Sequence, residues 1–415
     1  MPAIGGLTAA NGVVKIAGGE YTKIYEQTAE VYNRAYKGKG TPFGSRGFEI
    51  PTETSGVFTH GFPTDGGPLP AGESVQTIRP VVYATRYMHA VQITGASMEE
   101  LSKAVNRKDF SYIDSWTSLN LDNVVESAHK MFNIYLNGTG NGRLGTVSAG
   151  AASTTQTFSN NDNTRYLRRG MRIQIWDPTF TTLRGTAKIT SDPQVGATTV
   201  TLDTSITSTT GDFMTIAGGP NRPPVGLQHI IDDGTLSSVF FQNTSRTTVP
   251  KYCGQIINAN NTSLSMTTLR KILGAKIFPA MGTLKRGDYE IWSHDGQWSQ
   301  ISSLGWTLKR YDGASKSIDL GYTTLEWEGI PWVTEVDQPK DQVKFINWGS
   351  IQKFVTKDWG WDETGGDIWN RIPSTTAGSN FNDQFEAYYD CISNLGCPDP
   401  RVNGAIIALV VPAGW

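Results

Sequence analysis

The residue types that most often perform catalysis or bind metals are few in this chain and widely separated. They are five histidines and three cysteines: His60, His89, His129, His229, His294, Cys253, Cys391 and Cys397. No HExxH, HxH or CxxC spacing occurs among them, so a zinc site or a nucleophilic triad would have to be assembled entirely through space. An odd number of widely spaced cysteines also argues against a disulfide framework. We therefore predict that the chain is not an enzyme and uses no cofactor or metal.

Three further motifs suggest chemistry, and each has a simpler interpretation. The acidic residues between 358 and 367 could bind calcium, but their spacing lacks the alternating ligands of an EF-hand loop. The glycine-rich run 137–142 is unlike a phosphate-binding loop, because it closes a predicted helix and contains no GK[ST] sequence. His294-Asp295-Gly296 could be an acid–base pair, but it is more typical of a turn and a helix cap.

Composition favours strands, turns and long loops over helical bundles. The chain has 415 residues, 38% hydrophobic and 18% charged, with 45 glycines and 20 prolines. This length predicts two to four subdomains. The low charged fraction and the many glycines and prolines predict an α+β fold with β in the majority. A net charge of −2 gives the whole chain no basic bias toward nucleic acid. The N-terminus lacks a signal-peptide pattern and the longest apolar run, 405–411, is too short for a membrane span, so we expect a cytoplasmic chain without membrane contact.

The most informative segment, residues 57–95, has the pattern of a very long β-hairpin. Its outgoing half, 57–62, runs into the Pro- and Gly-rich tip 63–72, and its return half, 74–93, is rich in Val, Ile, Tyr and Thr. A leg of about 20 residues reaches roughly 65 Å, whereas a domain of ~100 residues has a radius of gyration near 13 Å. Such a ribbon must leave its own domain. Because two strands alone are marginally stable, we expect it to find partners on neighbouring chains.

Two helices are predicted directly after the hairpin. Ser97, followed by Glu100, has the spacing of a capping box that opens a short helix. A second helix over about 110–136 has a broad apolar face at helical spacing, would be ~40 Å long, and ends at Gly138. A helix of that length needs a sheet or a subdomain along it, so we interpret it as the spine of the molecule.

The remaining sequence falls into three parts. Residues 143–219 are rich in Thr, Ser and Asn with short alternating runs, which predicts a small β-barrel or sandwich inserted after the long helix. Residues 220–350 mix strands with two short helices, one of them ending at Gly274, and predict a separate α/β core. The tail 351–415 closes with a strand over 402–411, which we expect to pack beside the long helix.

Taken in order, these elements resemble the major capsid (coat) proteins of tailed double-stranded DNA bacteriophages, which have the Hong Kong 97-like fold. Three stretches carry most of the resemblance. LNGTGNG at 136–142 resembles the turn after the family's spine helix, GIPWV and QPKDQVKFIN within 329–347 resemble a core strand pair, and PDPRVNGAII at 398–407 resembles the closing strand. The resemblance covers roughly residues 20–415.

The resemblance implies five segments: an N-terminal arm (1–56), an E-loop (57–95), the spine helix of a peripheral domain (96–142), an axial domain (220–350) and the C-terminal part of the peripheral domain (351–415). Residues 143–219 depart from the family pattern, and we interpret them as an inserted β-domain. It implies self-assembly in the host cytoplasm into hexamers and pentamers, which close into an icosahedral virion capsid around non-specifically held double-stranded DNA. Portal and scaffolding proteins are implied partners, and a decoration protein is a further candidate. No lysine lies between Lys39 and Lys103, so a covalent cross-link through the E-loop is not expected.

We predict two sets of residues that contact a neighbouring subunit. The hairpin set is Phe58, Phe62, Arg79, Tyr83, Arg86 and Tyr87, and the arm set is Lys37, Lys39 and Arg46. Because strand residues alternate between faces, about half of the hairpin side chains should touch a neighbour. Two alternatives stay open. One is an encapsulin-type compartment with the same fold, which would enclose a cargo enzyme. The other is a carbohydrate-binding β-protein, whose tryptophans would stack on sugars.

Overall fold

The computed structural model describes residues 30–38, 41–43, 47–55, 67, 71–72, 74–150, 152–159, 167–192, 197–235, 240–281, 285–309, 326–363, 367–373 and 381–412. Over these residues the chain has an α+β fold, as predicted. It divides into two compact units. Unit 1 comprises Met1–Arg34, Ala84–Tyr135 and Val355–Ser393, and unit 2 comprises Ala35–Tyr83, Leu136–Phe354 and Asn394–Trp415.

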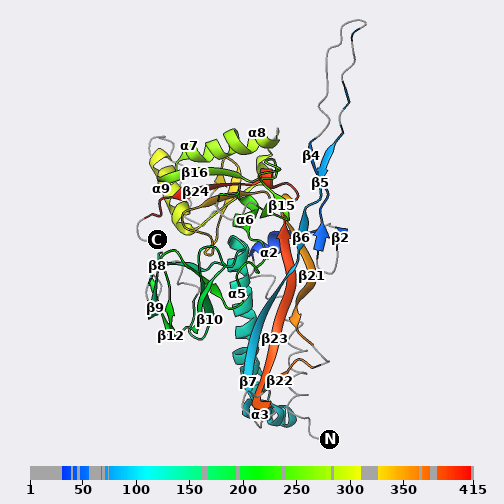
Figure 1. Ribbon diagram of the computed structural model, residues 1–415, viewed down its shortest axis with the longest axis vertical. Coiled ribbons are helices and arrows are strands. Elements are labelled where there is room, and N and C mark those ends of the chain that lie inside the picture. Colours follow the sequence, from blue (N-terminus) through cyan, green and yellow to red (C-terminus); the bar gives the residue numbers. More distant parts are fainter. Residues whose placement is uncertain are drawn as a thin grey trace. The chain divides into compact units, whose positions relative to one another are not determined.

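Unit 1 is built on a long helical run that lies along a sheet (Figure 1). After α3 (Gly95–Arg107), the run consists of α4 (Phe110–Thr117), the π-helical turn η1 (Ser118–Asp122) and α5 (Asn123–Asn137). The helix predicted over 110–136 is therefore confirmed, with a π-helical turn that the apolar spacing did not indicate. The predicted capping box was wrong, because the N-cap of α3 is Thr94, whose side chain accepts from the Ser97 backbone N–H. The Ser97 hydroxyl instead accepts from Trp116 Nε1 at 2.9 Å.

The sheet of unit 1 centres on one long strand. β23 (Phe381–Gly396) lies between β7 (Thr85–Thr94) on one side and β21 (Gln352–Trp361) and β22 (Asn370–Pro373) on the other. β7 and β23 pair antiparallel, from Thr85 opposite Ser393 to Thr94 opposite Gln384. We had predicted that β7 belongs to the return leg of the hairpin. It lies in this sheet instead, because β23 satisfies the backbone groups that a free leg would leave unpaired.

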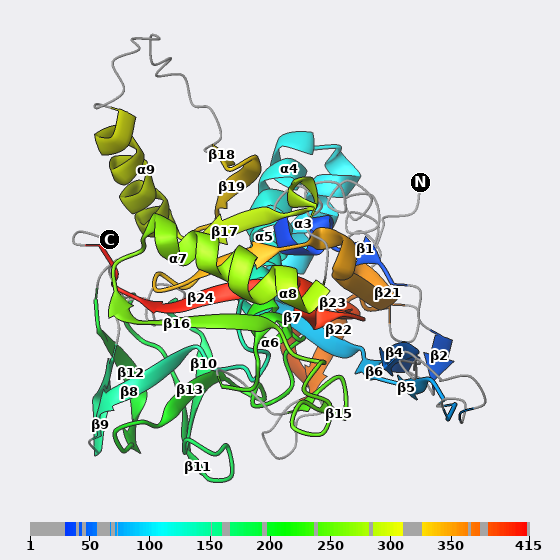
Figure 2. The same cartoon turned by 90° about the horizontal axis from the view of Figure 1, so that it is seen from above.

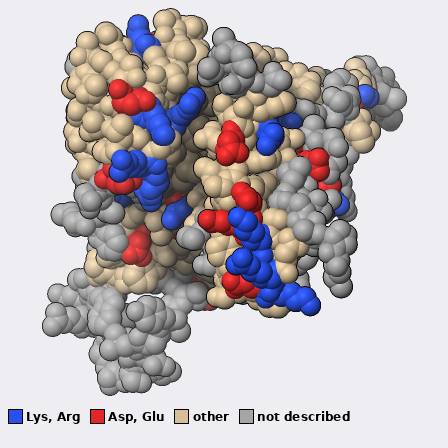
Figure 3. Space-filling view, turned by 90° about the horizontal axis from the view of Figure 1, so that it is seen from below, with Lys and Arg blue, Asp and Glu red and all other residues tan. Residues whose placement is uncertain are grey.

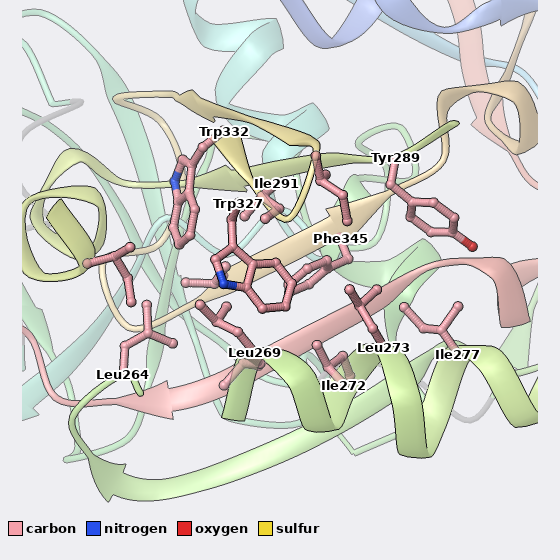
Figure 4. Close-up of a cluster of buried hydrophobic side chains, with 14 of the residues drawn as sticks. Leu264, Leu269, Ile272, Leu273, Ile277, Tyr289, Ile291, Trp327, Trp332 and Phe345 are labelled. Carbon is pink, nitrogen blue, oxygen red and sulfur yellow. The ribbon is translucent and has the colours of Figure 1, made fainter. Parts of the chain in front are cut away.

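Unit 2 contains a six-stranded mixed sheet covered by helices (Figure 2). Its strands, in spatial order, are β16 (Gln255–Thr262), β24 (Gly404–Leu409), β20 (Val343–Ile346), β17 (Glu290–Ser293), β19 (Ile330–Thr334) and β18 (Glu326–Trp327). α7 (Met266–Lys271) continues through the π-helical η3 (Ile272–Ile277) into α8 (Phe278–Met281), so Gly274 does not end this helix. Leu269, Ile272 and Leu273 point from the helix onto Trp327 and Phe345 of the sheet (Figure 4).

Two expectations about this sheet need correction. The closing strand 402–411 was expected beside the spine helix, but β24 pairs parallel with β16 and antiparallel with β20. The strands predicted at 329–347 as a pair are β19 and β20, and β17 lies between them. In both cases strands distant in sequence are brought together by buried apolar side chains such as Ile291, Phe345 and Ile406, whose contacts local patterns do not reveal.

The Thr-rich region forms a second six-stranded sheet, which closes on itself. Its order is β11 (Leu183–Lys188), β10 (Arg172–Trp176), β13 (Phe213–Ile216), β8 (Gly145–Ala149), β9 (Ala152–Phe158) and β12 (Thr199–Thr207). Thr190 N donates to Thr201 O at 2.9 Å and Ile189 bridges to Leu202, which brings the two end strands together. The result is a small barrel with Ile173, Ile175 and Met214 fully buried inside.

Shorter elements connect these parts. They are α2 (Glu30–Arg34), β1 (Tyr36–Lys37), α6 (Leu227–Ile231), β14 (Phe240–Phe241), β15 (Thr244–Ser245), η4 (Arg286–Asp288), α9 (Asp295–Lys309), η5 (Trp348–Ser350) and η7 (Pro400–Val402). α9 follows His294, whose Nδ1 accepts from the Gly296 backbone N–H at 3.1 Å. The segment His294-Asp295-Gly296 thus serves as a helix start, in agreement with the simpler interpretation of its sequence.

The end of α5 is held by a buried lysine. Lys344, on β20, has 1% of its surface exposed, and its Nζ donates to the backbone carbonyl of Asn137 at 3.1 Å. Gln338 Nε2 donates to the Asn137 side-chain oxygen. The carboxyl end of a helix carries partial negative charge, which suits a donor of this kind. Burial disfavours the charged ammonium, however, and lowers the pKa of Lys344 to about 7.

We predict that this lysine makes the stability of unit 2 depend on pH. Between pH 7 and ~10.4, the usual lysine pKa, the unfolded chain binds more protons than the folded chain, so the free energy of unfolding should rise with pH. Lys344→Met should remove this rise, which we expect to be ~2–4 kcal/mol, and should leave the protein at least as stable at pH 7. Urea unfolding of both proteins at several pH values measures how the free energy of unfolding depends on pH. Lys271→Met, at an exposed site on α7, is the control, and an unchanged slope in Lys344→Met would contradict the assignment.

Candidate functional site

The segment predicted to project from the molecule is a ribbon with a broader root. The root is a three-stranded sheet of β2 (Thr41–Phe43), β3 (Gly47–Glu49) and β6 (Val81–Tyr83). Beyond it, β4 (Thr52–Ser55) and β5 (Gln76–Ile78) pair with each other (Figure 1). The hairpin therefore begins before residue 57, where the sequence had placed its start. Among the described residues β4 and β5 form a two-stranded ribbon, a structure that is marginally stable by itself.

The root is fastened to the rest of unit 2 by hydrogen bonds between residues that are distant in sequence. Val81 N donates to Gln242 O at 3.0 Å, and Asn394 Nδ2 donates to Tyr83 O at 2.7 Å. These anchors were not predicted. No local sequence signal could have identified them, because each partner lies more than a hundred residues from the strand that it holds.

A small apolar cluster supports the same root. Phe48, Ile50, Val82 and Phe354 pack together, with the rings of Phe48 and Phe354 5.3 Å apart. A Cβ at Gly396 would lie 2.7–2.9 Å from side-chain atoms of Val82 and Phe354, so this approach requires glycine. Hydrogen bonds and packing together fix the direction in which the ribbon leaves the root.

Three of the predicted contact residues in unit 2 are accessible. Tyr83 is 52% exposed and Lys37 lies exposed on β1. Arg79 is 3.7 Å from Glu49, but 74% of its side chain is exposed, and such a pair contributes little to stability. These side chains are free to bind another chain. Phe58, Phe62, Lys39 and Arg46 lie outside the described residues.

Arg86 is also exposed, with 35% of its side chain accessible, but it forms ion pairs within unit 1. Its Nε donates to Asp390 at 2.7 Å and its terminal nitrogen lies 2.9 Å from Asp362. Lys357 also binds Asp390, whose side chain is completely buried. Two cations therefore compensate one buried carboxylate, which would otherwise carry a large desolvation cost. Asp362 belongs to the acidic segment considered for calcium, and here it pairs with arginine and lysine.

Tyr87 is half-buried, and its ring packs against aromatic side chains of unit 1. Its ring lies 5.5 Å from that of Phe132 on α5 and 5.9 Å from that of Trp359 on β21. His129 and Tyr389 complete this aromatic cluster, with the His129 ring 5.1 Å from that of Trp359. Burial lowers the pKa of His129 to about 3, so the imidazole is neutral at pH 7. The cluster joins the spine helix to the sheet, and it explains why Tyr87 faces inward within unit 1.

The described residues contain few of the features of a reaction centre. Among them, no group of three or more His, Cys, Asp or Glu side chains is placed to hold a metal ion. Burial raises the pKa of the Cys397 thiol to about 12 and lowers that of His229 to about 4, so both groups are neutral at pH 7. On the face drawn in Figure 3, Lys and Arg lie close to Asp and Glu in mixed groups. No helix in the described parts is long and apolar enough to cross a membrane.

The tryptophans considered for sugar stacking mostly fill the interior. Seven of them are buried: Trp116, Trp292, Trp327, Trp332, Trp348, Trp359 and Trp369. Trp116 and Trp369 pack edge to face in unit 1, with ring centres 6.2 Å apart. Buried aromatic rings of this kind stabilise cores and are not presented to a ligand.

Comparison with known proteins gives a match in structure. No protein-family model matches the sequence, and no curated protein matches it. The structure is similar to the capsid protein in the cyanophage A-1(L) capsid asymmetric unit, with a TM-score of 0.52 and 12% identity, over 91% of this chain and 90% of that one. The elements of both units are included in this coverage. The chain therefore has the fold of a phage capsid protein.

Two further structures are similar at lower scores. The capsid of a native GTA particle matches with a TM-score of 0.45 and 9% identity, over 92% of this chain and 91% of that one. The holo-SrpI encapsulin complex from Synechococcus elongatus matches with a TM-score of 0.41 and 6% identity, over 92% of this chain and 88% of that one.

The two tyrosines of the predicted contact set should respond differently to truncation. Tyr87→Ala removes a ring from the interior of unit 1 and should lower the free energy of unfolding of the unassembled chain by ~3 kcal/mol. Tyr83→Ala removes a half-exposed ring and should change it by less than ~0.5 kcal/mol. Urea unfolding of both variants under the same conditions measures this difference. Equal destabilisation would show that the environments of the two tyrosines are not distinct.

Proposed function

We propose that this chain, which has the fold of a phage capsid protein, is the repeating subunit of a closed protein shell. One observation carries the proposal. The ribbon of β4 and β5 is firmly anchored at its root, yet its strands pair only with each other among the described residues. The unpaired edges of such a ribbon need partners, and neighbouring copies in a shell supply them.

The shell that fits this fold is an icosahedral phage capsid made of hexamers and pentamers. Its contents would be double-stranded DNA, held without sequence preference, and its assembly in the host cytoplasm would involve portal and scaffolding proteins. In this assembly the exposed residues Lys37, Arg79 and Tyr83 contact neighbouring subunits, while Arg86 and Tyr87 stabilise unit 1. The work of the protein is then structural, and it has no catalytic role.

The test is assembly of the purified chain with and without the hairpin tip. We expect the full chain to form closed particles tens of nanometres across in negative-stain electron microscopy. Deletion of residues 63–72 should leave soluble monomers or capsomeres, because the contact that each ribbon makes with its neighbour is lost. Circular dichroism and thermal unfolding serve as the control, since both units should remain folded in the deletion variant.

Two outcomes would contradict the proposal. Shells of normal size and number from the deletion variant would show that the ribbon does not join subunits. A full chain that stays monomeric under all assembly conditions would contradict the shell function itself. If closed particles form in the cell, their contents distinguish a virion-type shell, which holds DNA, from an encapsulin-type compartment, which holds a cargo enzyme.

A further inference from the structure

A surface hollow lies beside the helix that covers the mixed sheet of unit 2. It has a volume of about 440 Å³. Volumes of roughly 300–1,000 Å³ are typical of sites that hold a small molecule, so this hollow can admit a side chain together with the groups that flank it. Its lining comes from the helix and from two neighbouring turns: Arg270, Leu273, Gly274, Phe278, Arg286 and Glu328.

The apolar part of the hollow is open to a partner. Phe278 is exposed at the start of α8. Gly274 lies inside the helical run, where glycine is destabilising relative to alanine. Among the described residues, no atom lies within 4 Å of the place that a Cβ of Gly274 would take. Packing inside the subunit therefore does not require glycine here, whereas the close approach of another chain does.

The rim of the hollow is cationic. Arg270 Nε lies 2.8 Å from one oxygen of Glu328, and a terminal nitrogen of Arg286 lies 3.2 Å from the other. Both arginine side chains are more than half exposed, and a guanidinium has five N–H donors, so one carboxylate does not exhaust them. Residues 232–290 contain seven Lys and Arg and four Asp and Glu, so the positive charge persists when the flanking carboxylates are counted.

The loop between β19 and β20 has the complementary character. Val336 is 69% exposed, and Glu335 and Asp337 flank it in the sequence. Residues 335–341 contain three acidic residues and one lysine. The net charge of this loop, and not any single unpaired carboxylate, is what a cationic rim attracts. An apolar tip with carboxylates on both sides thus matches an apolar hollow with arginines on its rim.

The hollow and the loop lie at opposite ends of one strand. Glu328 is in the turn that precedes β19, and Val336 is in the turn that follows it. The five residues of β19 span about 16 Å at ~3.3 Å per residue. Because β17 and β18 pair with β19 and hold it extended, the loop cannot fold back into the hollow of its own subunit. A contact between the two must join two copies of the chain.

We propose that the loop 335–337 of one copy inserts Val336 into this hollow of a second copy, so that its carboxylates face Arg270 and Arg286. The proposal rests on the shell function above and names one contact that joins the subunits. Loop and hollow are different surfaces, so the contact is head to tail, and such a contact repeated around an axis closes a ring. Duplex DNA would also bind the arginines, but it would leave Phe278 and Val336 exposed, so a second copy is favoured.

Filling the hollow tests the proposal. Gly274→Phe places a ring in the hollow and removes a glycine from a helix, so the melting temperature of the unassembled subunit should stay the same or rise. Shell yield should fall by ~10-fold or more, because the loop of the next copy is excluded. Ala275→Phe, at an exposed position of the same helix outside the lining of the hollow, is the control and should leave the yield unchanged. Thermal unfolding and negative-stain microscopy measure the two quantities, and a purely structural role for Gly274 would lower both.

Cross-linking identifies the surface that the loop contacts. In Gly274→Cys/Val336→Cys each copy carries one cysteine in the hollow and one on the loop, so a short bismaleimide should link assembled copies into a ladder of dimers, trimers and longer chains. A mixture of the two single variants should give dimers and nothing longer, because each copy then offers one engineered position. Each single variant by itself is the control for reaction at Cys253, which is partly accessible.

The outcomes separate this contact from the shell function. Normal shell yield from Gly274→Phe, or normal shells of the double-cysteine chain without a ladder, would overturn the contact and leave the shell function intact. Dimers from Gly274→Cys alone would indicate a two-fold contact between hollows, which overturns it as well. Loss of binding to random-sequence duplex DNA in Arg270→Gln/Arg286→Gln, with shell yield unchanged, would assign the hollow to nucleic acid. An unmodified chain that stays monomeric would contradict both the shell function and this contact, whereas a ladder together with the loss of yield supports the contact.

Discussion

A ribbon of two β-strands has two edges of backbone N–H and C=O groups that it cannot pair by itself, and this constraint shapes the molecule. The free-energy cost of these unpaired backbone groups is confined to β4 and β5. The root strands β3 and β6 are fastened to the rest of unit 2 through Gln242, Asn394 and the cluster around Phe354. A firmly held root with an unpaired extension is suited to reaching another chain. The remaining parts of the structure bury their apolar side chains within the same chain.

In each unit a buried charged side chain has specific partners. In unit 1 the buried carboxylate of Asp390 is bound by Arg86 and Lys357. In unit 2 the buried amine of Lys344 meets the carbonyl of Asn137. Both arrangements join elements that are distant in sequence. Rigid units of this kind are what an assembly of many identical copies requires, since each interface repeats the same geometry.

The sequence alone determined the α+β class, the long helix, the Thr-rich β-region and the presence of a projecting hairpin. These features depend on local periodicity and on turn residues, which are properties of short segments. It misplaced the cap of α3, because Thr94 and Ser97 are both acceptable caps and only the packing of Trp116 decides between them. Of the predicted contact residues, Lys37, Arg79 and Tyr83 are exposed, whereas Arg86 and Tyr87 contact partners from other segments. Their contact with a neighbouring subunit stays a prediction.

Only the tertiary structure decided which sheet each strand joins and where the hairpin leaves its root. β7 pairs with β23, and β24 pairs with β16, across separations of more than a hundred residues. β24 also pairs with β20, where Val343 lies opposite Ile406. Strand pairing of this kind is set by the burial of side chains from both partners at once. A sequence read segment by segment contains each strand's pattern, but not the identity of the strand against which it is buried.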